Sequence, residues 1–337
     1  LEMYANQRLN VRWNSVCTES FACRNGVKQG GVLSPILFCV YVDELLLRLR
    51  TRGIGCHIGN VFAGAFGYAD DLTLLAPSVP AAEEMLLICE EFAAEFFVKF
   101  NAAKSQHVVC PARRTTPVPT HQLKLNGHVI PQGDRAILLG TCIGADSQSR
   151  SLGKASVELV QRTNTLISRF HHAHSGIRLR LFQTYCCSFY SSPLWKLESP
   201  HFSSFKVTWK RCLKRVLGIS QRTRSRLLPH IISGPEVYVS LLSRFASFIT
   251  ACSQSANQIV RSALELGLRS QSAIASNIRV LLFELGMRFD DVVLMSKEMV
   301  ARCLMRRYQS DDNLVDSCVG RAIAELCLVR DGELRMD

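Results

Sequence analysis

The sequence has no long apolar run and no repeated or low-complexity segment. No run reaches the roughly 18 residues that a membrane-spanning helix requires, so membrane insertion does not explain the basic character of the chain. Acidic residues are scarce, because 28 Asp and Glu stand against 40 Lys and Arg, a formal net charge of +12. This excess is typical of proteins that bind a polyanion, and it favours nucleic acid as a partner.

The chain also lacks the spaced cysteine pairs of a zinc finger or zinc knuckle. Its 14 cysteines are scattered, and Cys39, Cys89 and Cys142 lie in segments that we expect to form the core. We therefore expect free, buried thiols in a reducing intracellular compartment. The histidine-rich residues 171–174, ahead of Cys186-Cys187, are interpreted as a polar loop followed by a buried cysteine pair.

The most informative feature that is present is Tyr68-Ala69-Asp70-Asp71, set between two short apolar runs, residues 61–67 and 72–76. The runs are rich in β-forming residues, so the pattern predicts two strands joined by a tight turn with both acids at its tip. Two carboxylates held this close repel each other, and a divalent cation is the usual remedy. A carboxylate pair suits Mg²⁺, which supports phosphoryl transfer. In isolation, such a pair is more often a solvated turn.

A glycine-rich loop precedes this turn in the sequence. It leads into a predicted helix that Ser34 can cap and Pro35 can start. Glycines let the backbone approach a ligand closely, and the N-terminus of a helix favours anionic groups. Alone, such a loop is most often only a turn. Together with the Tyr-Ala-Asp-Asp turn downstream it is much more specific.

In this combination the sequence resembles the reverse transcriptases of non-LTR (LINE-type) retrotransposons. Residues 26–35 resemble the second palm motif of that family, and Tyr68-Ala69-Asp70-Asp71 resembles its catalytic third motif. Residues 100–105 resemble the fourth motif and residues 137–143 the fifth. The fourth follows a helix expected over residues 80–98, whose apolar residues fall on one face: Met85, Leu86, Cys89, Phe92 and Phe96.

The resemblance implies an enzyme that uses an RNA template, a DNA primer and deoxynucleoside triphosphates. It implies that Asp70 is the main ligand of Mg²⁺, or of Mn²⁺, and Asp71 a weaker one. It places Tyr68 beside the primer end. Gln29 and Gly30 are expected to line the pocket for the templating base and the incoming nucleotide. The family also implies a ribonucleoprotein that occurs in the cytoplasm and the nucleus.

Two further positions of the resemblance concern the fourth and fifth motifs. The resemblance implies that Lys104 stabilises the leaving pyrophosphate, because a cation suits developing negative charge. A lysine that merely faces solvent is an equal alternative. In the fifth motif, Leu138 stands where the family usually has an aromatic residue, so the primer-gripping turn departs from the family pattern there.

The expected fold class is α+β. Residues 1–145 are expected to form a partial reverse-transcriptase palm, an antiparallel sheet with packed helices. Residues 146–240 are expected to form an all-α, thumb-like domain, with one helix over 157–170 and another over 177–190. Residues 241–337 are expected to form a helical extension of unknown role. The polar residues 146–151 are interpreted as the connector between the first two.

The densest basic segment lies in the expected thumb, where no acidic residue occurs between Pro200 and Gly234. Part of it has helical spacing, with Trp209 and Leu213 among the residues expected to face the core. We expect contact with the backbone of an RNA–DNA duplex or of element RNA; a merely solvated face is the alternative. The predicted nucleic-acid-binding residues are Lys206, Lys210, Arg211, Lys214, Arg215, Arg222, Arg224 and Arg226.

One departure from the family concerns the third catalytic aspartate, which the first palm motif supplies upstream of the glycine-rich loop. The first aspartate of this sequence is Asp43, and the only acids ahead of the loop are Glu2 and Glu19. Asp43 lies on the predicted helix after the loop, where the family has no metal ligand. We therefore expect a fragment that lacks the first palm motif, that is inactive alone, and that exposes apolar palm surface.

Two alternatives to a non-LTR polymerase remain at this stage. A catalytically dead, nucleic-acid-binding remnant of a decayed element would have the same basic segment. A group II intron maturase also uses the Tyr-Ala-Asp-Asp motif. The retention of Asp70, Asp71 and Lys104 favours descent from an active enzyme, because decay has no reason to spare them.

Overall fold

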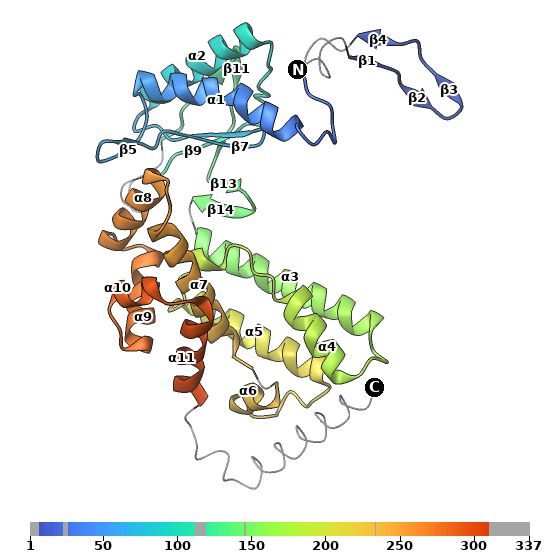
Figure 1. Cartoon of the computed structure of the whole chain (residues 1–337), viewed down its shortest axis with the longest axis vertical. Coiled ribbons are helices and arrows are strands. Elements are labelled where there is room, and N and C mark those ends of the chain that lie inside the picture. Colours follow the sequence, from blue (N-terminus) through green and yellow to red (C-terminus); the bar gives the residue numbers. More distant parts are fainter. Residues whose placement is uncertain (1–6, 23–25, 112–118, 145, 233, 310–337) are drawn as a thin grey trace. The chain divides into compact units, whose positions relative to one another are not determined.

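The computed structural model describes residues 7–22, 26–111, 119–144, 146–232 and 234–309. The chain folds as two compact units that meet in the sequence between Asp134 and Arg135 (Figure 1). Both contain helices and short strands, so the fold class is α+β. The predicted boundaries at 145 and 240 differ from this division, and residue 240 falls inside a helix, α7 (Val237–Ser253). The division of the chain into palm, thumb and C-terminal extension with separate functions stays a prediction.

The first unit contains two helices and twelve described strands. They are β1 (Arg8–Leu9), β2 (Arg12–Trp13), β3 (Val16–Cys17), β4 (Phe21–Ala22), α1 (Ser34–Arg52), β5 (His57–Ile58), β6 (Val61–Phe62), β7 (Ala65–Tyr68), β8 (Asp71–Leu74), α2 (Val79–Phe96), β9 (His107–Val108), β10 (Lys124–Leu125), β11 (His128–Val129) and β12 (Gln132–Gly133). Every described sheet has two strands. The pairs are antiparallel except β9–β12, which is parallel.

These pairs are smaller than the antiparallel sheet that the resemblance implied. Loop hydrogen bonds nevertheless join the β5–β6 and β7–β8 pairs. The amide of Cys56 donates to the carbonyl of Leu75 at 2.8 Å, and the amide of Leu75 donates to the carbonyl of Gly64 at 2.7 Å. The approach is close, since a Cβ at Gly64 would lie 2.6 Å from Cζ of Phe62. The two hairpins are therefore held together where only glycine fits.

The core of the first unit lies between α1 and α2. Leu45 and Leu49 of α1 are buried against Met85, Cys89 and Phe92 of α2. The predicted helix and its apolar face are thus confirmed, and Ser78 caps it by accepting a hydrogen bond from the amide of Ala81. Apolar residues of β6, β7 and β8 pack against the same cluster: Phe62, Ala65, Leu72 and Leu74.

Polar contacts reinforce this helix pair. Nη1 of Arg48 donates to Oε2 of Glu95 on α2 at 2.7 Å, and its Nε donates to Oε1 of Glu44 at 2.9 Å. The hydrogen bond from Arg48 holds the pKa of the Glu95 carboxyl below its usual range. The guanidinium also lies over the rings of Phe92 and Phe96. One arginine therefore bonds to acids on both helices and covers their aromatic residues.

The other side of α1 is exposed. Ile36, Val40 and Leu47 repeat at helical spacing and are largely open to solvent, as is Val32 just ahead of the helix. Cys39 is also exposed, so its predicted burial is wrong. The residues of α1 that face α2 are others, such as Leu45 and Leu49. An exposed apolar strip of this kind favours association.

The second unit is mainly helical. Its elements are β13 (Arg135–Leu138), β14 (Thr141–Gly144), α3 (Ser147–Arg169), α4 (Ser175–Leu181), the π-helix η1 (Phe182–Cys186), the 3₁₀-helix η2 (Ser192–Leu194), α5 (Pro200–Leu217), the 3₁₀-helix η3 (Ser225–Leu227), α6 (Leu228–Ile231), α7, α8 (Gln258–Arg269), α9 (Ala273–Leu285), α10 (Phe289–Leu294) and α11 (Lys297–Gln309). The second predicted helix ends at Cys186 and does not reach residue 190.

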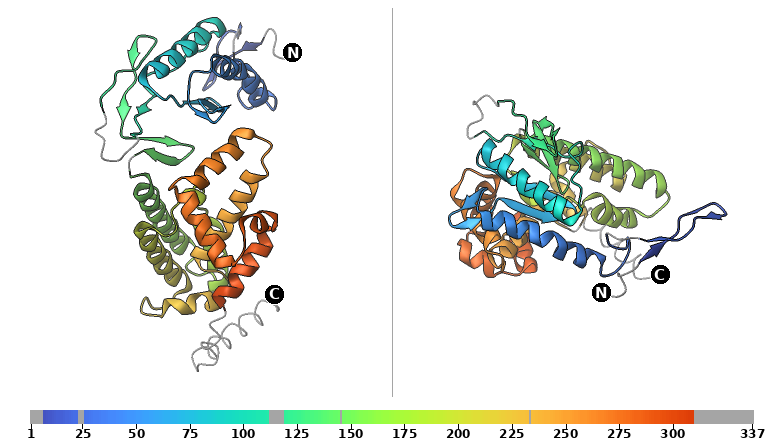
Figure 2. Two further views of the ribbon diagram at one scale, coloured as in Figure 1. Left: turned by 90° about the vertical axis from the view of Figure 1, so that its left-hand side faces the viewer. Right: turned by 90° about the horizontal axis from the view of Figure 1, so that it is seen from above.

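One continuous core runs through the second unit from Leu152 to Leu304. Helices α3 and α5 lie side by side in both views (Figures 1 and 2). Within α5, the residues predicted to face the core, including Trp209 and Leu213, are buried. Buried Asn277 of α9 fixes the chain before α5: its Nδ2 donates to the carbonyl of Trp195 at 2.7 Å, and its Oδ1 accepts from a neighbouring amide.

The cysteines that the structure describes are all free. Cys89, Cys186 and Cys212 are buried, while Cys142 is only half-buried. Burial raises the pKa of the Cys89 thiol to about 12, as it does for Cys187, so these thiols remain protonated and unreactive near neutral pH. In the part of the chain that the structure describes, no helix has the length and apolar character to cross a membrane.

Replacing Leu213 by alanine tests the core of the second unit. Leu213 is 0 % exposed, and truncation leaves a cavity that lowers the free energy of unfolding by about 2–5 kcal/mol. Val207→Ala on the same helix is the matched control, because Val207 is 49 % exposed; its effect stays within about 0.5 kcal/mol. Denaturant unfolding followed by circular dichroism measures both. Equal losses for the two variants would contradict the assigned core.

Candidate functional site

The two adjacent acids lie on an antiparallel hairpin, as predicted. Strand β7 pairs with β8 from Ala65 opposite Leu74 to Tyr68 opposite Asp71, so Ala69 and Asp70 form a two-residue turn. Ala69 has φ +51°, which is costly for a residue with a side chain and requires support from the surrounding structure. That support comes from β8, whose alternate leucines pack on the α1–α2 core.

The carboxylates of this hairpin are accessible. Asp70 and Asp71 are exposed, and so is the ring of Tyr68. Hard carboxylate oxygens suit a divalent cation such as Mg²⁺, which keeps several waters and takes further ligands from phosphates. Among the described residues there is no group of three or more His, Cys, Asp or Glu placed to hold a metal ion. The donor set is therefore a carboxylate pair that fits a cation whose remaining ligands come from elsewhere.

The glycine-rich loop forms a tight turn directly ahead of α1. The amide of Gly31 donates to the carbonyl of Lys28 at 3.0 Å, and Gly30 has φ +78°, the conformation that the third position of a type II turn requires. Gln29 and Gly30 are exposed at its tip. A Cβ at Gly30 would meet no other atom within 4 Å, so the backbone is open to a ligand.

Ser34 does not cap α1, contrary to the prediction. It is buried, and its hydroxyl donates to the carbonyl of Lys28 at 2.6 Å, so it ties the glycine turn to the start of the helix. Pro35 does stand in the first turn, as predicted. Helix α1 also packs on strand β7, where Gly67 lies against Leu46. The turn with Gln29 and the hairpin with Asp70 are thus carried by two elements in direct contact.

Lys104 lies in a turn of the first unit. Its amide donates to Oδ1 of Asn101 at 3.2 Å, and Ala102 is buried beneath the turn. The lysine side chain itself is exposed. Lys104 therefore faces solvent, as in the alternative to a catalytic lysine given above. Its catalytic role stays a prediction.

The predicted fifth motif is a second hairpin, which belongs to the second unit. Strands β13 and β14 pair from Arg135 opposite Gly144 to Leu138 opposite Thr141. The turn residues Leu139 and Gly140 both have positive φ, +48° and +77°, which matches a type I′ turn. The fifth motif thus contains a tight turn at Leu139 and Gly140, and its role in gripping a primer stays a prediction.

Some cations of the basic segment contact other residues of the chain, and others are exposed to solvent. Lys206 lies over the rings of Phe202 and Tyr238, and Lys210 forms an ion pair with Glu236. Exposed guanidinium groups extend from α5 into the following loop and η3: Arg211, Arg215, Arg222, Arg224 and Arg226. We call these five residues the arginine surface. Of them, Arg215 also donates to Oδ1 of Asn164 at 2.8 Å.

Lys214 is not part of that surface. It is 6 % exposed, and its Nζ donates to the carbonyls of Gln221 and Thr223 at 3.0 and 2.6 Å. Helix α5 ends at Gly218 in a left-handed cap, after which the chain folds back over the lysine. The predicted exposure of Lys214 is therefore wrong, since helical spacing did not reveal that return of the loop.

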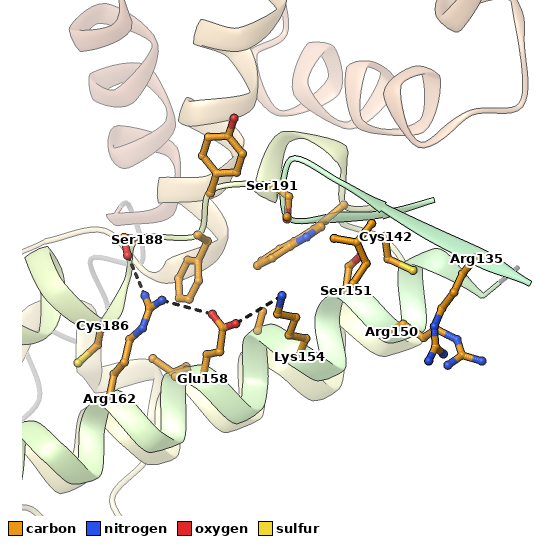
Figure 3. A pocket seen from close by; sticks show the side chains of 17 residues that line it. Arg135, Cys142, Arg150, Ser151, Lys154, Glu158, Arg162, Cys186, Ser188 and Ser191 are labelled. Carbon is orange, nitrogen blue, oxygen red and sulfur yellow. Dashed lines mark hydrogen bonds and ion pairs between the residues drawn. The ribbon is translucent and has the colours of Figure 1, made fainter. Parts of the chain in front are cut away.

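A cavity of about 390 Å³ in the second unit was not predicted. It lies among the β13–β14 hairpin, α3 and residues 186–195 (Figure 3). The signal in the sequence is a row of charges four residues apart on α3: Arg150, Lys154, Glu158 and Arg162. Such a row also fits a solvated helix face, and only the packing of the hairpin beside it creates a cavity.

Comparison with known proteins finds similarity over the N-terminal part of the chain. The model of the family described as reverse transcriptase (RNA-dependent DNA polymerase) matches residues 2–148. The chain is 39 % identical over 92 residues to the retrovirus-related Pol polyprotein from the type-2 retrotransposable element R2DM of Drosophila melanogaster. It is 34 % identical over 121 residues to the Pol polyprotein from a type-1 retrotransposable element R2 of Popillia japonica.

These matches cover a limited part of each protein. The Drosophila match spans 27 % of this chain and 8 % of the relative, and the Popillia match spans 35 % and 17 %. The chain therefore corresponds to less than a fifth of the length of these relatives. Within that part, the motif order and the relatives agree: residues 2–148 match the reverse-transcriptase family and are similar to the Pol polyproteins of R2 retrotransposable elements.

Proposed function

We propose that this chain supplies part of the active site and the nucleic-acid surface of an RNA-directed DNA polymerase, which copies element RNA from a DNA primer. The observation that carries the proposal is the β7–β8 hairpin, which holds Asp70 and Asp71 exposed at its tip while its leucines anchor it on the α1–α2 core. The enzyme acts as a ribonucleoprotein in the cytoplasm and the nucleus.

In this proposal Asp70 is the main ligand of Mg²⁺, or of Mn²⁺, and Asp71 a weaker one. When held by these carboxylates, divalent metal would supply charge stabilisation for phosphoryl transfer. The donor set supports this, because two exposed carboxylates offer hard oxygens and leave room for water and phosphate ligands. The hairpin supports this as well, because it places both acids next to each other at its exposed tip.

The other residues bind and orient substrates. Gln29 and Gly30 receive the templating base and the incoming deoxynucleoside triphosphate, which the open backbone of the glycine turn supports. Tyr68 lies against the primer end, and Lys104 neutralises charge on the leaving pyrophosphate. The exposed side chain of Lys104 supports access to an anion.

We further propose that the 337 residues by themselves do not extend a primer. Two-metal catalysis by this family requires a third aspartate, and the sequence has none ahead of Asp43. Asp43 and Glu44 belong to α1, and Glu44 is bonded to Arg48. The described residues contain no cluster of three acids that could complete a metal site, which supports an incomplete active site.

The arginine surface is proposed to contact the phosphates of the template–primer duplex or of element RNA. It has five exposed guanidinium groups, and the segment between Pro200 and Gly234 contains no acidic residue. Guanidinium groups pair well with phosphate oxygens and need no sequence-specific geometry. Lys206 and Lys210 extend this surface along α5, while buried Lys214 only stabilises the fold.

Substitution of the hairpin acids tests the metal site. Asp70→Asn lowers the affinity for Mn²⁺ about tenfold or more, the factor that corresponds to loss of about 1.4 kcal/mol, and Asp71→Asn lowers it less. The electron paramagnetic resonance signal of free Mn²⁺ measures the bound fraction. Asp43→Asn is the control, because Asp43 is exposed on α1. Unchanged binding in Asp70→Asn would exclude the hairpin as the metal site.

A primer-extension assay tests the incomplete active site. The purified chain is given an RNA template, an annealed DNA primer, deoxynucleoside triphosphates and either Mg²⁺ or Mn²⁺, and we expect no extended product. If the chain extends the primer robustly and Asp70→Asn abolishes this activity, the active site is complete after all and the polymerase function is confirmed. The reading frame upstream of Leu1 gives the complementary test: an aspartate-containing palm motif supports the enzyme, whereas a stop codon supports a remnant.

Charge reversal tests the arginine surface. The variant Arg211→Glu/Arg222→Glu/Arg224→Glu/Arg226→Glu removes four exposed cations, and removal of one cation–phosphate pair lowers the slope of log affinity against log salt by about 0.7–0.9. We therefore expect a slope smaller by about 3 for RNA binding. Fluorescence anisotropy at several salt concentrations measures it.

Lys214→Met provides the matched comparison for this experiment. Because Lys214 bonds only backbone carbonyls of the following loop, its loss lowers the melting temperature and leaves the salt slope unchanged. An unchanged slope in the four-arginine variant, or a flattened slope in Lys214→Met, would refute the division between surface and structural cations.

A further inference from the structure

The cavity of the second unit combines positive charge with aromatic walls. It measures about 390 Å³ and is lined by the β13–β14 hairpin, one face of α3 and residues 186–195 (Figure 3). None of the proposed active-site residues contributes to it. All of its lining lies within one compact unit, so its geometry is defined by that unit alone.

The charged side of the cavity is dominated by cations. Arg135, Arg150, Lys154 and Arg162 line it, against the single acid Glu158. Figure 3 shows Glu158 between Lys154 and Arg162 on α3, with Arg135 and Arg150 together at the other end. With one acid against four bases, the lining has a net excess of three positive charges.

Glu158 orients two of these cations. Nη2 of Arg162 lies 3.3 Å from Oε2 of Glu158, and Nζ of Lys154 lies 3.9 Å from Oε1. Nη1 of Arg162 donates to the hydroxyl of Ser188 across the cavity at 2.8 Å (Figure 3). The side chain of Lys154 remains 60 % exposed. The cations are thus held at the cavity, and Lys154 is accessible to an anion.

The apolar side includes three aromatic residues. Trp195 is 2 % exposed, and its ring centroid lies 5.7 Å from that of Phe189, tilted by 47°. Tyr190 also lines the cavity and is 78 % exposed. The indole Nε1 of Trp195 is buried without a hydrogen-bond partner among the described residues. Of these three aromatic residues, Tyr190 is the one whose ring is open to a planar group beside the cationic row, with Phe189 and Trp195 buried behind it.

We infer that this cavity binds a single nucleotide unit, with its phosphate at the cationic row and its base against the aromatic side. Cations on a fixed helix face pair with phosphate oxygens, and aromatic side chains stack on any base. The volume lies in the range of small-ligand pockets. An inorganic anion alone would leave the aromatic side unused, and an apolar ligand would not offset the excess of positive charge on the lining.

The same ligand chemistry has two sources. One is a free nucleoside monophosphate, and the other is an unpaired nucleotide that protrudes from an RNA strand. Both offer one phosphate and one base. The inference goes beyond the proposed polymerase function: residues of the predicted fifth motif line the cavity, but the site involves neither the Asp70 hairpin nor the arginine surface, and binding there holds whether or not the chain extends a primer.

Nuclear magnetic resonance of the full chain tests the inference. The chain has three tryptophans, and Trp195→Phe identifies the indole N–H signal of Trp195. Titration with adenosine monophosphate is expected to shift this signal saturably. Lys154→Gln is expected to weaken binding about tenfold, since a hydrogen bond to a charged group is lost. Arg169→Gln is the matched control, because Arg169 is an exposed cation of α3 outside the cavity lining.

The outcomes separate clearly. Absence of a shift at millimolar nucleotide, or equal affinity of Lys154→Gln and Arg169→Gln at unchanged melting temperature, overturns the inference. Inorganic phosphate that binds as tightly as the nucleotide also overturns it, because the base then contributes nothing. Competition by RNA with one bulged nucleotide, but not by the fully paired RNA, identifies a strand as the source. Binding of the mononucleotide without such competition identifies the free nucleotide.

Discussion

The packing of α1 against α2 is the interaction on which the candidate active site depends. Leucines of α1 and the aromatic face of α2 form a dry interface, and Arg48 bonds to Glu95 across it. In the described structure β7 and β8 form a sheet of only two strands. Such a sheet is only marginally stable by itself. Its leucines pack on the helix pair, and this anchoring allows two repelling carboxylates and a strained Ala69 to persist at an exposed tip.

The features that the sequence predicted correctly are those set by local pattern. The Tyr-Ala-Asp-Asp hairpin follows from two short β-forming runs around a turn. Helix α2 and the buried face of α5 follow from apolar residues at helical spacing. In each case neighbours within a few residues decide which side is buried. Family resemblance then added roles to Asp70 and Asp71 that no spacing rule supplies.

The features that were not predicted depend on segments that are distant in the chain or fold back on it. Lys214 has the same helical spacing as its exposed neighbours, yet the loop after Gly218 covers it and supplies carbonyl acceptors. Cys39 lies in an apolar run, yet α2 covers the other side of its helix. The cavity needs the β13–β14 hairpin, α3 and Trp195 together. Composition and periodicity carry no information about which of these surfaces meet.

In the functions proposed above, the two units bind a polyanion by opposite electrostatic means. In the first unit, Asp70 and Asp71 repel a phosphate unless a divalent cation lies between them, so binding there is conditional on metal. In the second unit, the arginine surface and the cationic row of α3 attract phosphate directly, and their affinity falls with salt. The proposed binding of nucleic acid by the second unit therefore needs no metal. The proposed chemistry needs in addition a divalent metal and a complete set of carboxylates, so in this proposal affinity and catalysis depend on different residues.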